Sequence, residues 1–248
     1  MALEEPLPRY GSLAEPGHYT TIEHKPLLTR YGTDVLIGVA ITTIVLVALA
    51  IWTDELWARI VLLAVAGFLT VFSLNFFRDP DRTPNTNGKS PEDLIIAPAD
   101  GKVVLIKEVD EPEYLRSSAR LISIFMSPLD VHVNRIPISG RVDHLRYVKG
   151  KFLVASTPES VSENERMMIG ISSGTRKLLF NQVTGYVARR IVCELKVGDT
   201  VKAGERFGMI KFGSRVDIYL PLDAELLIKE GDIAKAGETV VAQWKNAQ

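Results

Sequence analysis

Two long apolar stretches near the amino terminus constrain the fold of this chain more than any other feature. Residues 35–52 and residues 60–77 contain no charged side chain. Because an α-helix rises 1.5 Å per residue, a helix over either stretch is long enough to cross the apolar layer of a membrane. Trp52 and Trp57 lie in or beside the short connection, and tryptophan is enriched at membrane interfaces. We therefore expect a transmembrane helical hairpin; the alternative is a buried hairpin in the core of a soluble protein.

Basic residues indicate how such a hairpin would be oriented. They are more frequent outside the hairpin than in its turn, so the positive-inside rule puts both ends of the hairpin in the cytoplasm. We expect a protein of the cell inner membrane whose remaining residues lie on the cytoplasmic side. A cleavable signal peptide does not fit, because a polar, proline-containing segment precedes the first apolar stretch. The basic residues are Lys25 and Arg30 before the hairpin, Arg59 in its turn, and Arg78, Arg82 and Lys89 after it.

Composition excludes several classes of protein. The 248 residues include 29 Lys and Arg against 30 Asp and Glu, a formal net charge of −1, which argues against nucleic acid binding through bulk positive charge. A hydrophobic fraction of 46% excludes disorder for most of the chain. The single cysteine, Cys193, excludes a disulfide framework and a thiolate-rich zinc site, and it reads as a small buried apolar residue. The sequence predicts no metal site.

The rest of the chain predicts a mainly β domain. Residues 1–34 lack periodicity and hold several prolines, so we expect an irregular tail, followed by the hairpin at 35–77 and one domain at 78–248. Short β-branched or alternating runs separated by Gly, Pro and Asp indicate a barrel or sandwich, with short helices near 112–118 and 159–164. The predicted strands are residues 102–109, 121–126, 131–136, 166–171, 186–195 and 216–220.

An eight-residue unit occurs twice in this domain. The sequence GDTVKAGE at 198–205 returns as GDIAKAGE at 231–238. The Gly-Asp and Ala-Gly pairs mark turns that let short strands fold back, as in the barrel-sandwich hybrids of biotinyl and lipoyl carriers. A carrier lysine between two methionines is absent from the sequence. A membrane-tethered carrier or adaptor of this type, without catalysis, is one interpretation of the chain.

A second interpretation comes from five motifs that follow one another along the chain. The chain resembles the phosphatidylserine decarboxylase proenzymes of the short bacterial type. The motifs are FRDP at 77–80, APADG at 97–101, MSPLDVH at 126–132, ARRIV at 188–192 and FGSR at 212–215. A carrier or adaptor would leave these motifs as coincidences, whereas a decarboxylase uses them.

The resemblance implies a self-processing enzyme. The Ser214 hydroxyl would attack the Gly213 carbonyl, and β-elimination would then split the chain into a β chain, 1–213, and an α chain, 214–248, which stay together as a heterodimer. Ser214 would become a covalent pyruvoyl group, so that no external cofactor is needed. Phosphatidylserine would form a Schiff base with this group and lose CO2 to give phosphatidylethanolamine. The implied partners are the phospholipid substrate and the membrane, with a higher oligomer possible and no nucleic acid.

The serine needs a base, and two histidines of the β domain are candidates. In longer family members the motif around 127–132 carries two histidines three residues apart, and the second is the self-processing base; here the first slot holds His132 and the second Arg135. Since a guanidinium stays protonated, either His132 takes over or His144 reaches the site from another strand. Asp100 is the carboxylate expected to orient the imidazole, or else a turn residue before Gly101.

Three arginines are candidates for binding the substrate phosphodiester. Arg189 and Arg190 are neighbours, so in a strand only one of them faces a given pocket, and a solvated surface pair is the alternative. Arg78 follows the second apolar stretch and either contacts lipid phosphate or belongs to a hinge that fixes the domain against the bilayer.

Overall fold

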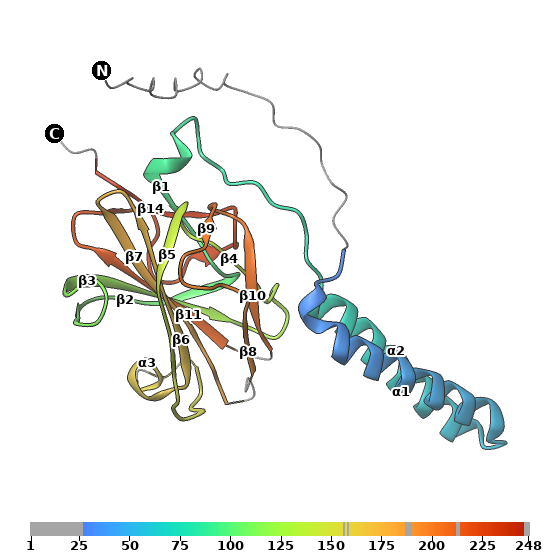
Figure 1. The fold of residues 1–248 in the computed structure, drawn as a ribbon. Coiled ribbons are helices and arrows are strands. Elements are labelled where there is room, and N and C mark those ends of the chain that lie inside the picture. Colours follow the sequence, from blue (N-terminus) through green and yellow to red (C-terminus); the bar gives the residue numbers. More distant parts are fainter. Residues whose placement is uncertain (1–26, 156, 158, 187–189, 212–213, 246–248) are drawn as a thin grey trace, which may run out of the picture.

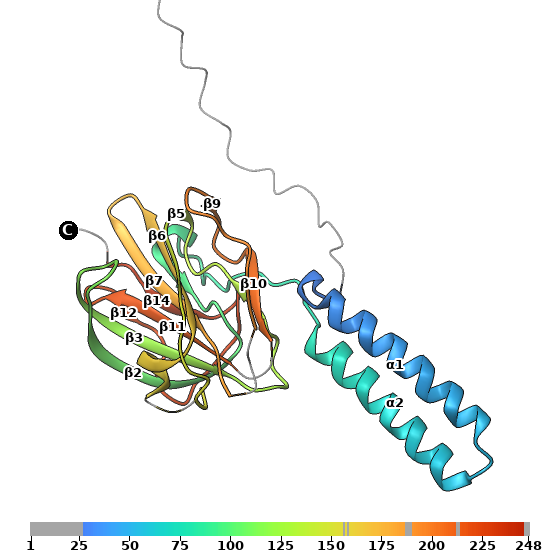
Figure 2. The same cartoon turned by 60° about the horizontal axis from the view of Figure 1, so that its bottom comes forward.

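The protein consists of a helical hairpin beside a β domain (Figure 1). The computed structural model describes residues 27–155, 157, 159–186, 190–211 and 214–245. A short 3-10 helix, η1 (Arg30–Gly32), leads into α1 (Thr33–Trp52), and α2 (Leu56–Phe76) returns beside it (Figure 2). Both helices are long and apolar enough to cross a membrane, and most of their surface is exposed. The expected helical hairpin is therefore present.

The β domain is built around a curled sheet of eight antiparallel strands. Two three-stranded sheets complete it, and η2 (Pro91–Asp93) and α3 (Ser160–Glu163) are its short helices. In spatial order the large sheet contains β13 (Ile233–Ala234), β2 (Gly101–Glu111), β3 (Ser117–Met126), β11 (Ser214–Pro221), β7 (Arg176–Val183), β6 (Arg166–Ser173), β5 (Gly140–Val148) and β9 (Thr200–Val201). The second sheet contains β4 (Val133–Arg135), β10 (Arg206–Lys211) and β8 (Arg190–Cys193), and the third contains β1 (Leu94–Ile96), β14 (Val240–Gln243) and β12 (Glu225–Leu226).

The mainly β architecture confirms the predicted fold class, with one local error. Each predicted strand region overlaps an observed strand, and the short helix near 159–164 is present as α3. The helix expected near 112–118 is wrong: this segment is a turn between β2 and β3. The Glu111 carboxylate explains the turn, because it accepts the backbone N–H groups of Glu113, Tyr114 and Leu115. These are donors that the turn itself would otherwise leave unpaired.

The repeated eight-residue units occupy equivalent places at the two edges of the large sheet. Each unit contributes a turn and then a two-residue strand, β9 at one edge and β13 at the other. Gly198 and Gly231, which open the two units, have φ of 101° and 93°, a conformation that side chains other than glycine rarely adopt. The two repeated units therefore provide both edge strands of the sheet that contains Ser214.

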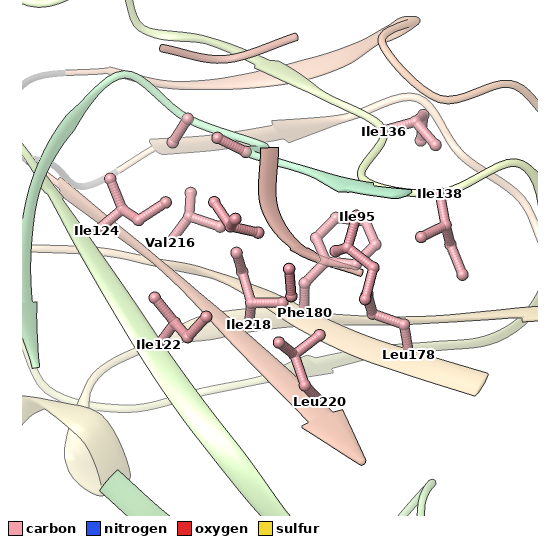
Figure 3. Close-up of a cluster of buried hydrophobic side chains, with 14 of the residues drawn as sticks. Ile95, Ile122, Ile124, Ile136, Ile138, Leu178, Phe180, Val216, Ile218 and Leu220 are labelled. Carbon is pink, nitrogen blue, oxygen red and sulfur yellow. The ribbon is translucent and has the colours of Figure 1, made fainter. Parts of the chain in front are cut away.

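A large apolar core fills the interior of the β domain (Figure 3). Side chains of β3 and β11 point into it from adjacent strands, and Phe180 of β7 meets them there. Because side chains alternate along a strand, Val216, Ile218 and Leu220 face this core while Arg215 and Asp217 face the other side of the sheet.

A second, smaller cluster joins the base of the hairpin to the β domain. Strand β10 lies on the side of the domain nearest the hairpin in both views (Figures 1 and 2), and β8 lies on the same side in Figure 1. The cluster spans the expected boundary between residues 77 and 78, because hairpin residues and β-domain residues are buried against each other. Its buried members are Tyr31, Phe76, Phe77, Val131, Val133 and Met209.

Replacing Gly32 with alanine is expected to loosen this junction. A Cβ at Gly32 would lie 2.0 Å from Cδ1 of the buried Phe77 ring. Overpacking of this kind costs about 1–3 kcal/mol, which lowers Tm by several degrees in a protein of this size. Gly38→Ala is the matched control, because nothing lies within 4 Å of its Cβ position. Thermal unfolding in detergent micelles measures the effect, and equal Tm values for the two variants would contradict the packing argument.

Candidate active site

Ser214 lies at the start of β11 in a fully buried position. Its exposed fraction is 0%, and its hydroxyl donates to the sulfur of Met126 over 3.3 Å. A thioether sulfur is a weak acceptor, so among the residues that the structure describes the hydroxyl has no strong hydrogen-bonding partner. The residue is paired with Met126 of β3, and the next residue, Arg215, is paired with both β3 and β7. The predicted attack partner, Gly213, lies outside the described residues.

Arg215, directly after the candidate nucleophile, holds the start of β11 from the opposite face of the sheet. Its guanidinium donates to both oxygens of Asp217 over 2.7 and 3.0 Å, and to Ala155 O and Ser160 Oγ. Ser123 of β3 also donates to Asp217 over 2.6 Å. Sequence analysis missed this buried network, although a charged pair two residues apart beside the Gly-Ser pair was a visible signal.

His132 is buried against the last residue of α2. Its ring stacks on Phe76 with centroids 4.1 Å apart, and its exposed fraction is 0%. Nδ1 lies 2.9 Å from the Asp130 carbonyl oxygen. Because a carbonyl only accepts, Nδ1 carries the hydrogen, and the lone pair of the neutral ring is on Nε2. Within the described part of the chain Nε2 has no hydrogen-bond partner.

Burial keeps this imidazole neutral. The pKa of His132 is lowered from 6.5 to about 4; desolvation is the largest cause, and the nearby charge of Arg78 acts in the same direction. The Asp130 carbonyl acts in the opposite direction without restoring the ordinary value. At neutral pH the ring is therefore a proton acceptor that is held in one tautomer and shielded from water.

Strand pairing brings the chain segments of His132 and Ser214 together. Val133 of β4 pairs with Met209 of β10, and β10 runs toward Ser214. Asn134 Nδ2 lies 3.9 Å from the same Met126 sulfur that accepts the Ser214 hydroxyl. Gln182 donates to Asn134 Oδ1 over 2.9 Å. The histidine and the serine are not hydrogen-bonded to each other, so their two segments meet around Met126 and Asn134.

The structure does not bring His144 to Ser214. His144 lies on β5, three strands from β11, in the row that contains Gly170, Leu179 and Tyr219. At ~3.4 Å per residue and ~4.8 Å per strand, this is about 17 Å along and about 14 Å across the sheet from Ser214. Its Nε2 lies 3.2 Å from Glu113 Oε1 near the sheet surface.

Asp100 is buried, but its partners are not the imidazole. Its carboxylate makes a two-point ion pair with Arg82, one contact at 2.8 Å, and accepts the Ala236 N–H over 2.8 Å. Gly101, which follows, has a φ of 144°, and a Cβ there would lie 2.0 Å from the Phe125 carbonyl oxygen. Asp100 and Gly101 of the motif at 97–101 thus fix the start of β2 beside β3. The Asp130 carbonyl, rather than Asp100, makes the hydrogen bond that orients His132.

Comparison with known proteins identifies the family of this chain. The family model for phosphatidylserine decarboxylase matches residues 69–242. A phosphatidylserine decarboxylase proenzyme of Prosthecochloris aestuarii is 49% identical over 220 residues, which cover 89% of this chain and 99% of that protein. The chain belongs to the phosphatidylserine decarboxylase family. Proenzymes of the same name from Chlorobium luteolum (47% over 218 residues; 88% and 100%) and Salinibacter ruber (50% over 196 residues; 78% and 85%) are also similar.

Membership of the phosphatidylserine decarboxylase family confirms the resemblance that the five motifs indicated. Decarboxylases are carboxy-lyases, so the chain is an enzyme of that class. The non-catalytic carrier or adaptor is not favoured. Among the described residues, no group of three or more His, Cys, Asp or Glu side chains is arranged to hold a metal ion.

The structure describes two of the three arginines that are candidates for substrate binding in this decarboxylase family member. Both of them contact other residues of the chain. Arg78 donates to Asn75 Oδ1 over 2.8 Å and to the Leu129 carbonyl over 2.9 Å, which ties the end of α2 to the turn before His132. Arg190 is exposed and pairs with Asp34 over 3.0 Å. Arg189 lies outside the described residues. Arg135, in the second histidine slot, is a structural residue that donates to Asp79, Pro80 and Gly204.

The imidazole of His132 should stay neutral far below the usual pH. In the Ser214→Ala chain, which keeps the precursor intact, nuclear magnetic resonance should give His132 a midpoint near pH 4, with the signal assigned by its loss in His132→Gln. Because the unfolded state has the higher pKa, it takes up the proton first, so this residue weakens the fold between pH 6.5 and about 4 and has no effect at higher pH. A midpoint near 6.5 would show that the ring is hydrated.

Proposed function

We propose that this chain is a self-processing phosphatidylserine decarboxylase that cleaves itself between Gly213 and Ser214 and then converts phosphatidylserine to phosphatidylethanolamine. One observation carries the proposal: a fully buried serine begins β11 beside the β4–β10 pair, and the Nε2 of a neutral, buried histidine there has no hydrogen-bond partner among the described residues. The relatives named above are called proenzymes, which agrees with processing.

In the first step the Ser214 hydroxyl leaves Met126 and attacks the Gly213 carbonyl carbon. The new C–O bond replaces the C–N bond, so the amide becomes an ester and Ser214 acquires a free amine. The hydroxyl proton passes to that amine, and His132 Nε2 is the group that takes it up and returns it. Apo and precursor geometries are often looser than the reacting geometry, so the absence of a direct hydrogen bond is compatible with this role.

The second step breaks the chain. A base removes the Cα proton of Ser214, the Cβ–Oγ bond breaks, and the 1–213 chain leaves with the former ester oxygen as its terminal carboxylate. The residue left on the 214–248 chain is dehydroalanine, which tautomerises to an imine. Water replaces the imine nitrogen, ammonia leaves, and a pyruvoyl group remains. No outside oxidant or reductant is needed.

The surroundings of Ser214 fit such a group. The position is buried and next to a thioether sulfur, which suits an uncharged ketone better than a charged amine. The pyruvoyl group would supply a carbonyl that binds the substrate amine and takes up the electron pair released with CO2. Pairing with β3 and β7, together with the Arg215–Asp217 contacts, would hold the start of the 214–248 chain in place after cleavage. The two chains would then remain one heterodimer.

The hairpin is proposed to span the inner membrane with the β domain on the cytoplasmic side. Its helices are long, apolar and exposed along most of their length. Since His132 packs on the last residue of α2, the site lies at the level where a lipid headgroup emerges from the bilayer. Arg78, Arg189 and Arg190 are proposed to contact the phosphodiester, and the division into 1–34, 35–77 and 78–248 remains a proposal about sequence segments.

Removing the nucleophile is expected to abolish cleavage. Ser214→Ala has no hydroxyl to attack, so denaturing electrophoresis should show one chain of 27.5 kDa and no decarboxylase activity. Ser173→Ala is the control, because Ser173 is an exposed serine at the end of β6 and should cleave as the wild type does. A small fragment from Ser214→Ala would refute Ser214 as the nucleophile.

The two histidines are expected to differ sharply. His132→Gln should slow formation of the 214–248 fragment about 100-fold or more, the usual contribution of a general base. His144→Gln should cleave near the wild-type rate, because this side chain lies far from Ser214 along the sheet. Asp100→Asn should slow cleavage less than His132→Gln does, by weakening the Arg82 contact. Time courses of the fragment decide the ranking, and slow cleavage in His144→Gln alone would reverse the assignment.

A further inference from the structure

We propose that Asp34, in the first turn of α1, is a positioning residue for self-cleavage. Its carboxylate holds Lys211, the last residue of β10, which lies three residues before Ser214 in the sequence. The inference rests on the proposed self-cleavage. It adds that the precursor becomes competent to cleave only when its hairpin is docked on the β domain.

One carboxylate ties the ends of two strands to the hairpin. Asp34 Oδ1 accepts from Lys211 Nζ over 2.8 Å, and Oδ2 accepts from Arg190 Nη1 over 3.0 Å. Lys211 and Arg190 are register partners in β10 and β8. The N-terminus of α1 favours a negative charge at this position through the helix dipole. Asp34 therefore fixes both strands where they face the hairpin.

Burial of the Lys211 side chain makes the loss of its carboxylate partner costly. It is 5% exposed, so its ammonium has little access to water. Without its carboxylate, a buried ammonium is costly, and the side chain would have to turn toward solvent and carry the end of β10 with it. Ser214 follows three residues later, within ~10 Å of extended backbone. Displacement at Lys211 therefore reaches the scissile segment.

Self-cleavage is sensitive to such displacement. Reacting atoms must approach to about 3–3.5 Å with the right orientation, and a misplacement of ~1 Å can cost about 100-fold in rate. The hairpin also holds the other participant, because Phe76 at the end of α2 stacks on His132. Docking of the hairpin thus fixes the positions of both the proposed base and the segment on which it acts.

Headgroup binding is an alternative role for Lys211, and the test must distinguish it from the positioning role. An almost buried ammonium near the start of β11 could bind the anionic headgroup of the substrate. In that case its loss would raise KM of the processed enzyme and leave self-cleavage intact. A positioning role predicts the opposite order, with slow cleavage of the precursor and little change in KM once the chain has been processed.

The experiment follows formation of the 214–248 fragment from the full chain synthesised in a cell-free system with phosphatidylcholine vesicles. Asp34→Asn and Lys211→Met should each cleave at least about 10-fold more slowly than the wild type, within the range expected for a misplaced reacting group. Asp34→Glu and Lys211→Arg, which keep the charges, should recover most of the rate. Arg30→Gln is the matched control, since it removes another ion pair between the hairpin segment and the β domain, with Glu194, away from Lys211.

Hydroxylamine identifies the step that is slowed, because it cleaves an ester once one has formed. It should not restore fragment formation in Asp34→Asn if the initial attack is misplaced. Alkaline extraction of the vesicles checks insertion, and Lys211→Met, whose hairpin is unchanged, decides the matter if Asp34→Asn fails to insert. If the wild type cleaves and both Asp34→Asn and Lys211→Met cleave as fast as it does, the inference is overturned. Normal self-cleavage of these variants with a raised KM of the processed enzyme would overturn it as well. Absence of the fragment from the wild type would instead refute the proposed function.

Discussion

The contact between Phe76 and His132 is the one on which the rest of the site depends. It closes the imidazole off from water, and it does so with the last residue of a helix that is proposed to leave the membrane at that level. Dehydration lowers the pKa of the ring, while the Asp130 carbonyl fixes its tautomer, so that a neutral Nε2 is available. In the proposed function, an enzyme for a membrane lipid would thereby use its proposed membrane anchor as one wall of its reaction site.

The opposite face of the large sheet supplies the rigidity that the proposed self-cleavage would require. A chain that cuts itself at the start of β11 must keep that strand in place afterwards. Pairing with β3 and β7 along β11 and the buried contacts of Arg215 with Asp217 and Ala155 provide this. The apolar side chains of β11 add their burial in the core. The new terminus would therefore remain where it was made, although no covalent bond would join it to the 1–213 chain.

Local patterns predicted the fold better than they predicted the site. The hairpin, the repeated turns and the alternating strands are encoded within a few residues, so they could be read directly. β7 was missed because Asn181 and Gln182 are buried there, which breaks the apolar pattern. The distance of His144 from Ser214 depends on sheet order, and the stacking of Phe76 on His132 joins residues far apart in sequence. Neither follows from spacing along the chain.

Intact mass spectrometry of the purified wild-type protein tests the central claim most directly. The account predicts two chains: residues 1–213 with an ordinary carboxyl terminus, and residues 214–248 lighter by one ammonia than the peptide with serine at its start. That difference reports the pyruvoyl group itself, independently of any activity assay. A single mass of 27.5 kDa from protein that decarboxylates phosphatidylserine would contradict the account, as would a small chain that retains its serine.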